Sequence, residues 1–356
     1  MFALAGLHRV DRGAEVAFIS VARELVKLGN EVTLIGSGPP RPGEPYRYIQ
    51  TPAVSRNRFE RWPSVPTLRN DTGWEEATFV PGLLAKYHPG DFDITATCAF
   101  PWTQWALRRP VLGGHRPQNV FVTQNGDWPA FSNKAEFRFF GCDGLVCTNP
   151  DYLERNADRY RCSLIPNGVD LNRFHPGPSE RERLGLPTKG PIVLMVSALI
   201  PSKNVAEGVK AVAEVPGANL VVAGDGPIRD EIQKLAGELL PGRFQQITLP
   251  AAEMPALYRS ADAFMHLSID ESFGNVFVEA LASSLPIIAY DKPRTRWIIG
   301  DVGFFAQTAD DLTASIGEAL KAGRRASADE RAQRFGWSSV ARQYSSFFEE
   351  VHRSPS

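Results

Sequence analysis

Two glutamates in the second half of the chain are the first candidates for chemistry. Glu271 lies in a loop after an apolar run, and Glu279 lies more than one turn into the helix expected to follow. Carboxylates accept hydrogen bonds, so the vicinal hydroxyls of a sugar or a ribose are natural partners for them. The spacing is too wide for an acid and a base acting on one bond, but it suits two groups that hold opposite ends of one ligand.

The residues between these glutamates form the junction of the loop and the helix. Gly274 would let the backbone approach a ligand closely, since glycine has no side chain. The helix N-terminus that follows, at Asn275 and Val276, would direct amide groups and a positive dipole end toward a phosphate. An acidic residue near a helix start is also typical of ordinary capping, and the segment alone leaves both interpretations open.

A lysine follows another apolar run. Lys203 lies in a Pro-Ser-Lys loop after the strand expected at 192–197. A cation at the end of a buried strand could bind an anionic ligand. A solvated surface lysine is the alternative, and the position directly after a core strand favours the first interpretation.

Short apolar runs alternate with amphipathic helical stretches along the whole chain. In the first half, strands are expected at 2–7, 31–35, 46–50, 92–97, 119–123, 144–148 and 162–165, and helices at 14–28, 75–87, 103–108, 133–140 and 150–160. In the second half, strands are expected at 192–197, 219–224, 244–249, 263–267, 286–290 and 303–306, and helices at 204–213, 228–238, 252–260, 275–283, 309–322 and 337–352.

This alternation predicts an α/β protein with parallel sheets covered by helices on both faces. Its repetition on either side of a link near 166–175 predicts two doubly wound domains that face each other. Ligands of such sheets bind outside the carboxyl ends of the strands, so a cleft between the two domains is the expected site.

The composition excludes several classes of protein. The chain has 356 residues with 39 basic and 40 acidic side chains, so a nucleic-acid partner is not expected. Four cysteines without Cys-x-x-Cys spacing favour free thiols in a reducing cytosol. No apolar run is long enough to span a bilayer, and the apolar start is too short for a signal peptide. We therefore expect a cytoplasmic protein.

Six segments, in order along nearly the whole chain, resemble the signature of the retaining GT-B glycosyltransferases of family 4. The segments are Asp11-Arg12-Gly13-Ala14-Glu15, residues 165–170, residues 196–203, Ala223-Gly224-Asp225-Gly226-Pro227, residues 257–263, and residues 270–280 with Glu271, Phe273-Gly274 and Glu279.

The resemblance implies a GT-B fold of two facing Rossmann-like domains. Residues 1–168 would bind the acceptor and 169–335 the sugar nucleotide, with the final helix, 336–356, returning to the first domain. It implies retaining, metal-independent transfer of a hexose-type sugar from a nucleoside-diphosphate sugar to a glycan or lipid-linked acceptor. A UDP-sugar is the preferred donor, GDP-mannose is possible, and neither a cofactor nor a metal is expected.

The resemblance also implies roles for single residues. Glu271 would contact the donor sugar, Lys203 the diphosphate and Glu279 the ribose hydroxyls. Asn125 and Asp127 are further catalytic candidates near the acceptor. The remaining donor-site candidates are Arg12, Gly13, Ser197, Gly224, Gly226, Leu249, Phe273, Gly274, Asn275 and Val276.

Two departures from the family pattern bear on this expectation. Ala198 stands where an arginine is usual, so one phosphate cation is missing; Arg294, Arg296 or Arg12 could replace it. Asn125 stands where a histidine is frequent, and an asparagine cannot take a proton. The leaving phosphate oxygen could take the acceptor proton instead.

Several other features have plainer interpretations. Asp91-Phe92-Asp93 resembles a metal-binding triplet, but it lies at the entry to a strand. The interleaved basic and aromatic residues of 56–62, 108–109 and 134–140 could contact a membrane peripherally or the acceptor, or be solvated. His8 and His115 are possible acceptor-side groups.

Two other functions fit the same motifs. A sugar-nucleotide isomerase on this fold, such as a 2-epimerase, would convert its donor without an acceptor. A catalytically silent sugar-nucleotide binder or partner subunit is suggested by Ala198 and Asn125.

Overall fold

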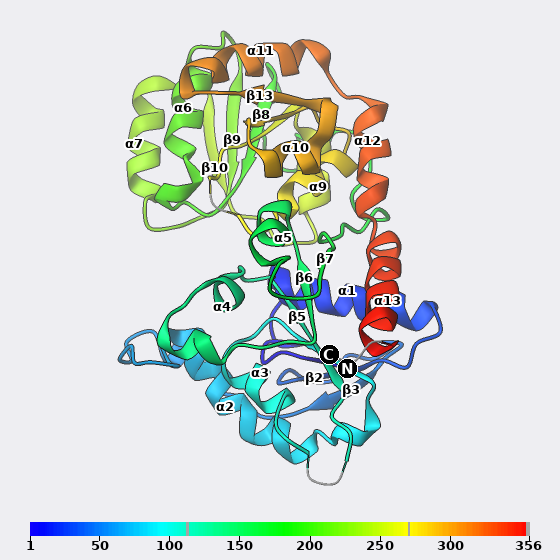
Figure 1. Cartoon of the computed structure of the whole chain (residues 1–356). Coiled ribbons are helices and arrows are strands. Elements are labelled where there is room, and N and C mark those ends of the chain that lie inside the picture. The colour runs from blue at the N-terminus through cyan, green and yellow to red at the C-terminus, as the bar shows by residue number, and fades with distance from the viewer. Residues whose placement is uncertain (112–113, 270, 354–356) are drawn as a thin grey trace. The chain divides into compact units, whose positions relative to one another are not determined.

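The computed structural model describes residues 1–111, 114–269 and 271–353, which form two compact units. The N-terminal unit comprises Met1–Asn167 and the segment from Trp337 onward, and the C-terminal unit comprises Gly168–Gly336. Each unit contains one sheet of parallel strands with helices on both faces (Figure 1). The prediction of two doubly wound parallel-sheet domains is confirmed.

The sheet of the N-terminal unit has the order β3-β2-β1-β4-β5-β6-β7. Its strands are β1 (Phe2–Ala3), β2 (Thr33–Gly36), β3 (Arg47–Gln50), β4 (Ile94–Thr97), β5 (Gln118–Val122), β6 (Gly144–Cys147) and β7 (Cys162–Leu164). Its helices are α1 (Gly13–Lys27), α2 (Asp71–Lys86), α3 (Trp102–Leu107), α4 (Trp128–Phe131), α5 (Pro150–Asn156) and α13 (Trp337–Arg353), with 3-10 turns η1 (Arg56–Arg58), η2 (Pro89–Asp91) and η3 (Ala135–Phe139).

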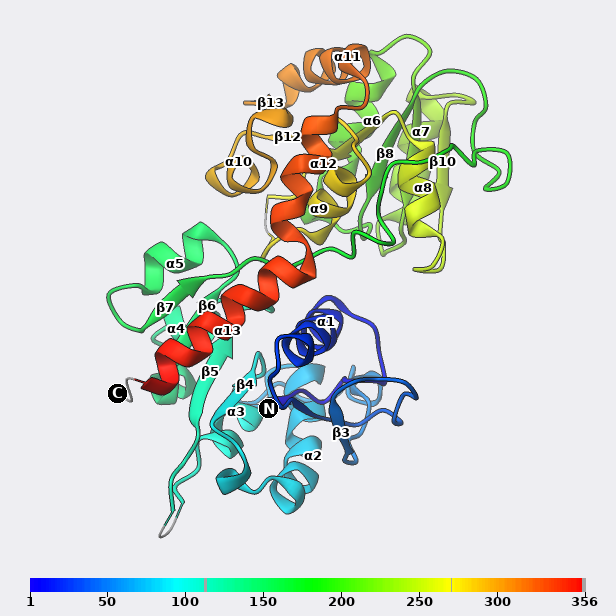
Figure 2. The same ribbon diagram turned by 90° about the vertical axis from the view of Figure 1, so that its right-hand side faces the viewer.

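The last helix belongs to the core of the N-terminal unit. In α13, Val340, Tyr344, Phe347 and Val351 recur at helical spacing and are buried. They join a cluster with the apolar face of α1, and the two helices lie side by side (Figure 2). The other face of this sheet is covered by α2 and α3, and by the aromatic residues around α4 and α5.

The sheet of the C-terminal unit has the order β10-β9-β8-β11-β12-β13. Its strands are β8 (Ile192–Val196), β9 (Asn219–Ala223), β10 (Phe244–Ile247), β11 (Ala263–His266), β12 (Ile287–Tyr290) and β13 (Gly303–Ala306). Its helices are α6 (Val205–Ala213), α7 (Arg229–Leu239), α8 (Met254–Ser260), α9 (Asn275–Ala282), α10 (Pro293–Ile299), α11 (Leu312–Ala322) and α12 (Ala326–Ala332), with 3-10 turns η4 (Pro201–Lys203), η5 (Gly300–Val302), η6 (Ala309–Asp311) and η7 (Gln333–Phe335).

Both faces of this second sheet are buried, which explains its continuous apolar strands. In β8, Ile192 and Leu194 pack toward α8, α9, α10 and α12, whereas Val193 and Met195 pack toward α6, α7 and α11. In both sheets the chain winds outward in one direction and then in the other. The switch points lie between β1 and β4 and between β8 and β11, where ligands of doubly wound folds bind.

The structure corrects several predicted elements. The strand expected at 2–7 ends at Ala3, because the chain turns through hydrogen bonds from Leu7 N to Leu4 O and from Arg9 N to Gly6 O. The helix expected from 75 begins at Asp71, because the Asn70 side chain caps it by accepting from Gly73 N.

Short helices account for most of the other differences. The helix expected at 133–140 is only the 3-10 turn η3, and α4 precedes it. Helices α10 and α12, with seven residues each, were not expected. Elements of one or two turns show too little periodicity to be recognised in a sequence.

Removing one aromatic ring from α13 should destabilise the N-terminal unit. Phe347 is 3% exposed and packs over the start of β6 at Gly144. Phe347→Ala should lower the free energy of unfolding by about 3–5 kcal/mol, since it leaves a cavity in the core. Urea unfolding measures this loss. Ser346→Ala, on the exposed side of the same helix, is the control and should change little.

Candidate active site

Lys203 and Glu271 meet at the switch point of the C-terminal unit. Lys203 ends the turn after β8, and Glu271 lies in the loop after β11, the strand paired with β8. The Lys203 Nζ forms an ion pair with Glu271 Oε1 and donates a hydrogen bond to Ser268 Oγ at 3.2 Å. The parallel sheet therefore brings together two charges that lie 68 residues apart.

His266, the last residue of β11, is part of the same cluster and was not foreseen. Its Nε2 lies 3.1 Å from Glu271 Oε1, and its ring packs edge-on against Phe277. The residue is 3% exposed, and its Nδ1 has no hydrogen-bond partner among the described residues. In the sequence His266 lies within an apolar run, and this pattern predicts only a residue of a core strand. The available signal was a histidine at a strand end, five residues before Glu271.

These partners determine the ionisation of Glu271. Burial alone would raise the pKa of this carboxyl, but the hydrogen bond and charge of His266 and those of Lys203 outweigh burial and lower the pKa to about 2. The carboxylate is therefore ionised throughout the physiological range. It can accept hydrogen bonds from hydroxyl groups throughout this range.

Glu279, on α9, has the opposite electrostatic environment. Burial raises its pKa to about 7, against the smaller lowering effects of Tyr258 and Arg173. The Tyr258 hydroxyl donates a hydrogen bond of 2.8 Å to Glu279 Oε2. The two glutamates that the sequence singled out thus differ in charge state near neutral pH. Glu271 is fixed as an anion, whereas Glu279 can gain or lose a proton.

One residue between the glutamates, Gly274, has a backbone conformation that favours glycine. Gly274 has φ +94°, and a Cβ there would lie 2.9 Å from the Phe277 ring. It precedes Asn275, where α9 begins, so the positive end of this helix lies beside the Glu271 loop. Phe273 is buried against Trp297 and Phe335 and anchors the loop in the core. Asp270 lies outside the described residues.

Gly224 and Gly226 lie in the loop after β9, which packs against residues 197–199. A Cβ at Gly224 would collide with the carbonyl oxygen of Ser197, and one at Gly226 with that of Leu199. Hydrogen bonds from Ser197 N to Ala223 O and from Leu199 N to Asp225 O join the same two loops. The glycines therefore let the loop after β9 pack directly against the loop that leads to Lys203. Leu249, after β10, is partly buried against the core.

Ala198 supplies no cation, and three arginines are candidates to replace one. Of these three, Arg294 lies at the Glu271 loop. Its Nη1 donates to the carbonyl oxygen of Glu271, and its Nη2 donates to that of Ile269 at 3.2 Å. Arg296 instead pairs with Asp291. Arg12 belongs to the N-terminal unit.

The N-terminal candidates lie near the switch point of their own sheet. Arg12 is the N-cap residue of α1, Gly13 is its first residue, and Asn125 is an exposed residue in the loop after β5. The Asp127 carboxylate is buried and accepts from Arg155 Nε at 2.9 Å and from Asn156 Nδ2 at 3.3 Å. These contacts hold α5 against the start of α4.

Asp91, Asp93 and His8 do not lie exposed at the carboxyl edge of the N-terminal sheet. Asp91 and Asp93 flank the amino end of β4. His8 is buried, with its Nε2 2.8 Å from the Tyr46 hydroxyl and its ring stacked on Tyr48. Among the described residues there is no group of three or more potential metal ligands and no helix of the length and apolarity that a membrane span requires.

Solved structures of glycosyltransferases have the same fold. Sucrose-phosphate synthase of Thermosynechococcus elongatus superimposes with a TM-score of 0.76 at 20% identity, covering 99% of both chains. Anabaena HepE in complex with UDP-glucose superimposes with a TM-score of 0.69 at 17% identity, covering 98% of this chain and 99% of that one. The two parallel-sheet units thus have the GT-B fold of these structures.

Sequence comparison gives the family. The model of "Glycosyltransferase Family 4" matches residues 12–173, and that of "Glycosyl transferases group 1" matches residues 178–335. The D-inositol 3-phosphate glycosyltransferase of Mycolicibacterium smegmatis is 35% identical over 91% of this chain and 83% of its own length. The lipopolysaccharide core glycosyltransferase LpsE of Rhizobium meliloti is 27% identical over 59% of this chain and 64% of its own. The chain belongs to glycosyltransferase family 4.

Nucleotide affinity should depend on pH through Glu279. A carboxylate accepts hydrogen bonds from ribose hydroxyls better than a neutral carboxyl does. With a pKa of about 7, ionisation of Glu279 should raise the affinity for UDP or GDP about tenfold between about pH 6 and about pH 8.

Calorimetric titration of the wild type and of Glu279→Gln measures this effect. The nucleotide's own phosphate ionisation is common to both proteins, so only the wild type should show the additional rise. Identical pH profiles in the two proteins would contradict a ribose contact at Glu279.

Proposed function

We propose that this glycosyltransferase is a retaining, metal-independent enzyme. It would transfer a hexose-type sugar from a nucleoside-diphosphate sugar to a glycan or lipid-linked acceptor. The observation that carries the proposal is the cluster of Lys203, Glu271 and His266 at the switch point of the C-terminal unit. It combines a cation for a diphosphate with a permanently ionised acceptor for sugar hydroxyls.

The leaving diphosphate would be stabilised by protein groups alone. Lys203 supplies one charge, and the N-terminus of α9 supplies a dipole. Arg294 is the candidate for the second cation, because it is held at the Glu271 loop. When a donor binds, Lys203 would exchange part of its contact with Glu271 for a phosphate oxygen, and the Glu271 carboxylate would accept from the sugar instead.

The acceptor proton would leave with the diphosphate. Asn125 cannot take a proton, and the Asp127 carboxylate is engaged by Arg155 and Asn156. In a reaction on the front face of the sugar, the bond from the anomeric carbon to the phosphate oxygen breaks as the acceptor oxygen attacks. That phosphate oxygen then takes the acceptor's proton, so no separate base is required.

UDP is the preferred nucleotide of the proposal. Its support is the HepE neighbour, whose structure contains UDP-glucose. GDP-mannose is the second donor to be tested, because one relative is a GDP-mannose-dependent mannosyltransferase.

Loss of either charged group should reduce turnover strongly. Lys203→Met and Glu271→Gln should each lower kcat about 10²–10³-fold with UDP-glucose or GDP-mannose, in buffer containing a chelator. Lys210→Met, an exposed lysine on the adjacent α6, is the matched control and should retain wild-type turnover. Product formation is followed by liquid chromatography and mass spectrometry.

Other outcomes would overturn the proposal in distinguishable ways. Near-normal turnover in both variants would show that this cluster is not the donor site. Conversion of the donor to an epimer without any acceptor would identify an isomerase. Nucleotide binding with neither transfer nor slow donor hydrolysis would identify a silent binding subunit, and loss of activity in chelator would contradict metal independence.

A further inference from the structure

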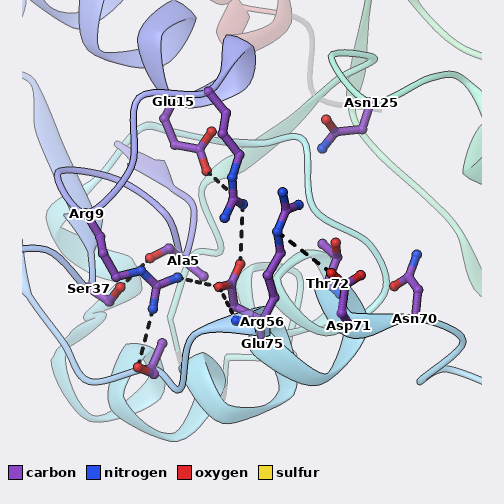
Figure 3. A network of polar contacts seen from close by, with 12 residues as sticks. Ala5, Arg9, Glu15, Ser37, Arg56, Asn70, Asp71, Thr72, Glu75 and Asn125 are labelled. Carbon is purple, nitrogen blue, oxygen red and sulfur yellow. Dashed lines mark hydrogen bonds and ion pairs between the residues drawn. The ribbon is translucent and has the colours of Figure 1, made fainter. Parts of the chain in front are cut away.

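A buried carboxylate on α2 organises three arginines of the N-terminal unit. Glu75 is 3% exposed, and its Oε1 accepts from Arg9 Nη2 and, at 2.9 Å, from the backbone N of Arg56 (Figure 3). Its Oε2 lies 3.8 Å from Arg12 Nη1. These arginines come from the loop after β1, the start of α1 and η1. One carboxylate thus hydrogen-bonds two segments of the chain and lies close to a third.

A second buried carboxylate, that of Glu15, also lies close to Arg12. Glu15 on α1 is 4% exposed, and its Oε1 lies 3.8 Å from Arg12 Nη1. It packs so closely on Gly6 that a Cβ there would collide with its carboxylate. Burial raises the pKa of Glu15, against the lowering effect of its own backbone N–H and of Arg12.

Two of the guanidinium groups near these carboxylates, those of Arg12 and Arg56, reach solvent. The Arg12 and Arg56 side chains are 30% and 34% exposed. Among the described residues, the structure gives neither guanidinium a hydrogen bond to a protein acceptor. Their ion pairs with Glu15, Glu75 and Asp71 are all 3.8 Å long, beyond hydrogen-bond range. Their N–H groups therefore remain available to an external acceptor atom.

The position of these groups in the fold is one where ligands bind. Arg12 lies at the start of the helix that follows β1, a strand at the switch point of this sheet. The Asn125 side chain, after β5, points toward the same space as the Arg56 guanidinium (Figure 3). Asn125 is exposed, and its amide can both donate to and accept from hydroxyl groups.

We propose that Arg12 and Arg56 form a subsite for a phosphate monoester carried by the acceptor, while Asn125 contacts its hydroxyls. This inference rests on the proposed function and adds the chemical class of the acceptor. Guanidinium groups bind phosphate through paired, charge-assisted hydrogen bonds. Two of them suit a dianion better than the single charge of a carboxylate. Asp71, 35% exposed, would turn away from Arg56 as the phosphate binds.

Matched acceptors test the subsite in the wild type. Glucose 6-phosphate and D-inositol 3-phosphate are compared with glucose and myo-inositol, and glucuronate supplies a carboxylate of similar size. The phosphorylated acceptors should have kcat/KM values about 10–100-fold above their neutral partners, mainly through KM. Equal values within each pair, or a preference for glucuronate over glucose 6-phosphate, would overturn the proposal.

Variants then assign the preference to these arginines. Arg56→Gln should raise KM for the phosphorylated acceptors about tenfold or more and change KM for the neutral acceptors little; Arg12→Gln is expected to weaken the same acceptors. Arg58→Gln, an exposed arginine in the same turn, is the matched control and should behave as the wild type. Equal effects of Arg56→Gln and Arg58→Gln would overturn the assignment.

A binding measurement separates this proposal from the proposed function. Calorimetric titration of the whole chain with glucose 6-phosphate requires no transfer. Wild type and Arg58→Gln should bind it, and Arg56→Gln should bind it at least about tenfold more weakly. No binding to the wild type, or equal binding to all three, would overturn the subsite. Failure of UDP and GDP to bind would count against the proposed function alone.

Discussion

The ion pair between Lys203 and Glu271 is the interaction on which the C-terminal site depends. Both side chains are largely removed from solvent, 16% and 21% exposed, and charges in such a place require partners. Lys203 and His266 provide them for Glu271, and the pairing fixes the carboxylate at one position above the sheet. A ligand that enters must replace these contacts in kind, with an anion for the lysine and hydroxyls for the carboxylate.

The surrounding loops have the conformations that this pairing requires. Gly224 and Gly226 permit one loop to lie directly on the next, which places the turn that ends at Lys203. Gly274, with its positive φ, is the N-cap residue of α9 and lets this helix begin beside the Glu271 loop. The neighbouring strands β8 and β11 then determine the distance between the two charges, because parallel strands end at the same edge of the sheet.

The fold and part of the site could be predicted from the sequence because they depend on local patterns. Alternating apolar runs and helical stretches predict the two parallel sheets, and position after a strand singles out Lys203 and Glu271. The other contacts depend on tertiary structure. His266 has the spacing of a core strand residue, and Arg294 reaches the Glu271 loop from 23 positions away. Glu75 meets Arg9 across 66 residues, which no local pattern indicates.

Hydrogen exchange with and without nucleotide tests whether the switch point of the C-terminal unit binds the sugar nucleotide. Saturating UDP or GDP, in the presence of a chelator, should slow amide exchange in the loop at 197–203 and in the segment 271–279. Exchange in the strands and in α7 should remain unchanged. Protection confined to the N-terminal unit, or no protection with any nucleoside diphosphate, would show that the nucleotide does not bind at this switch point.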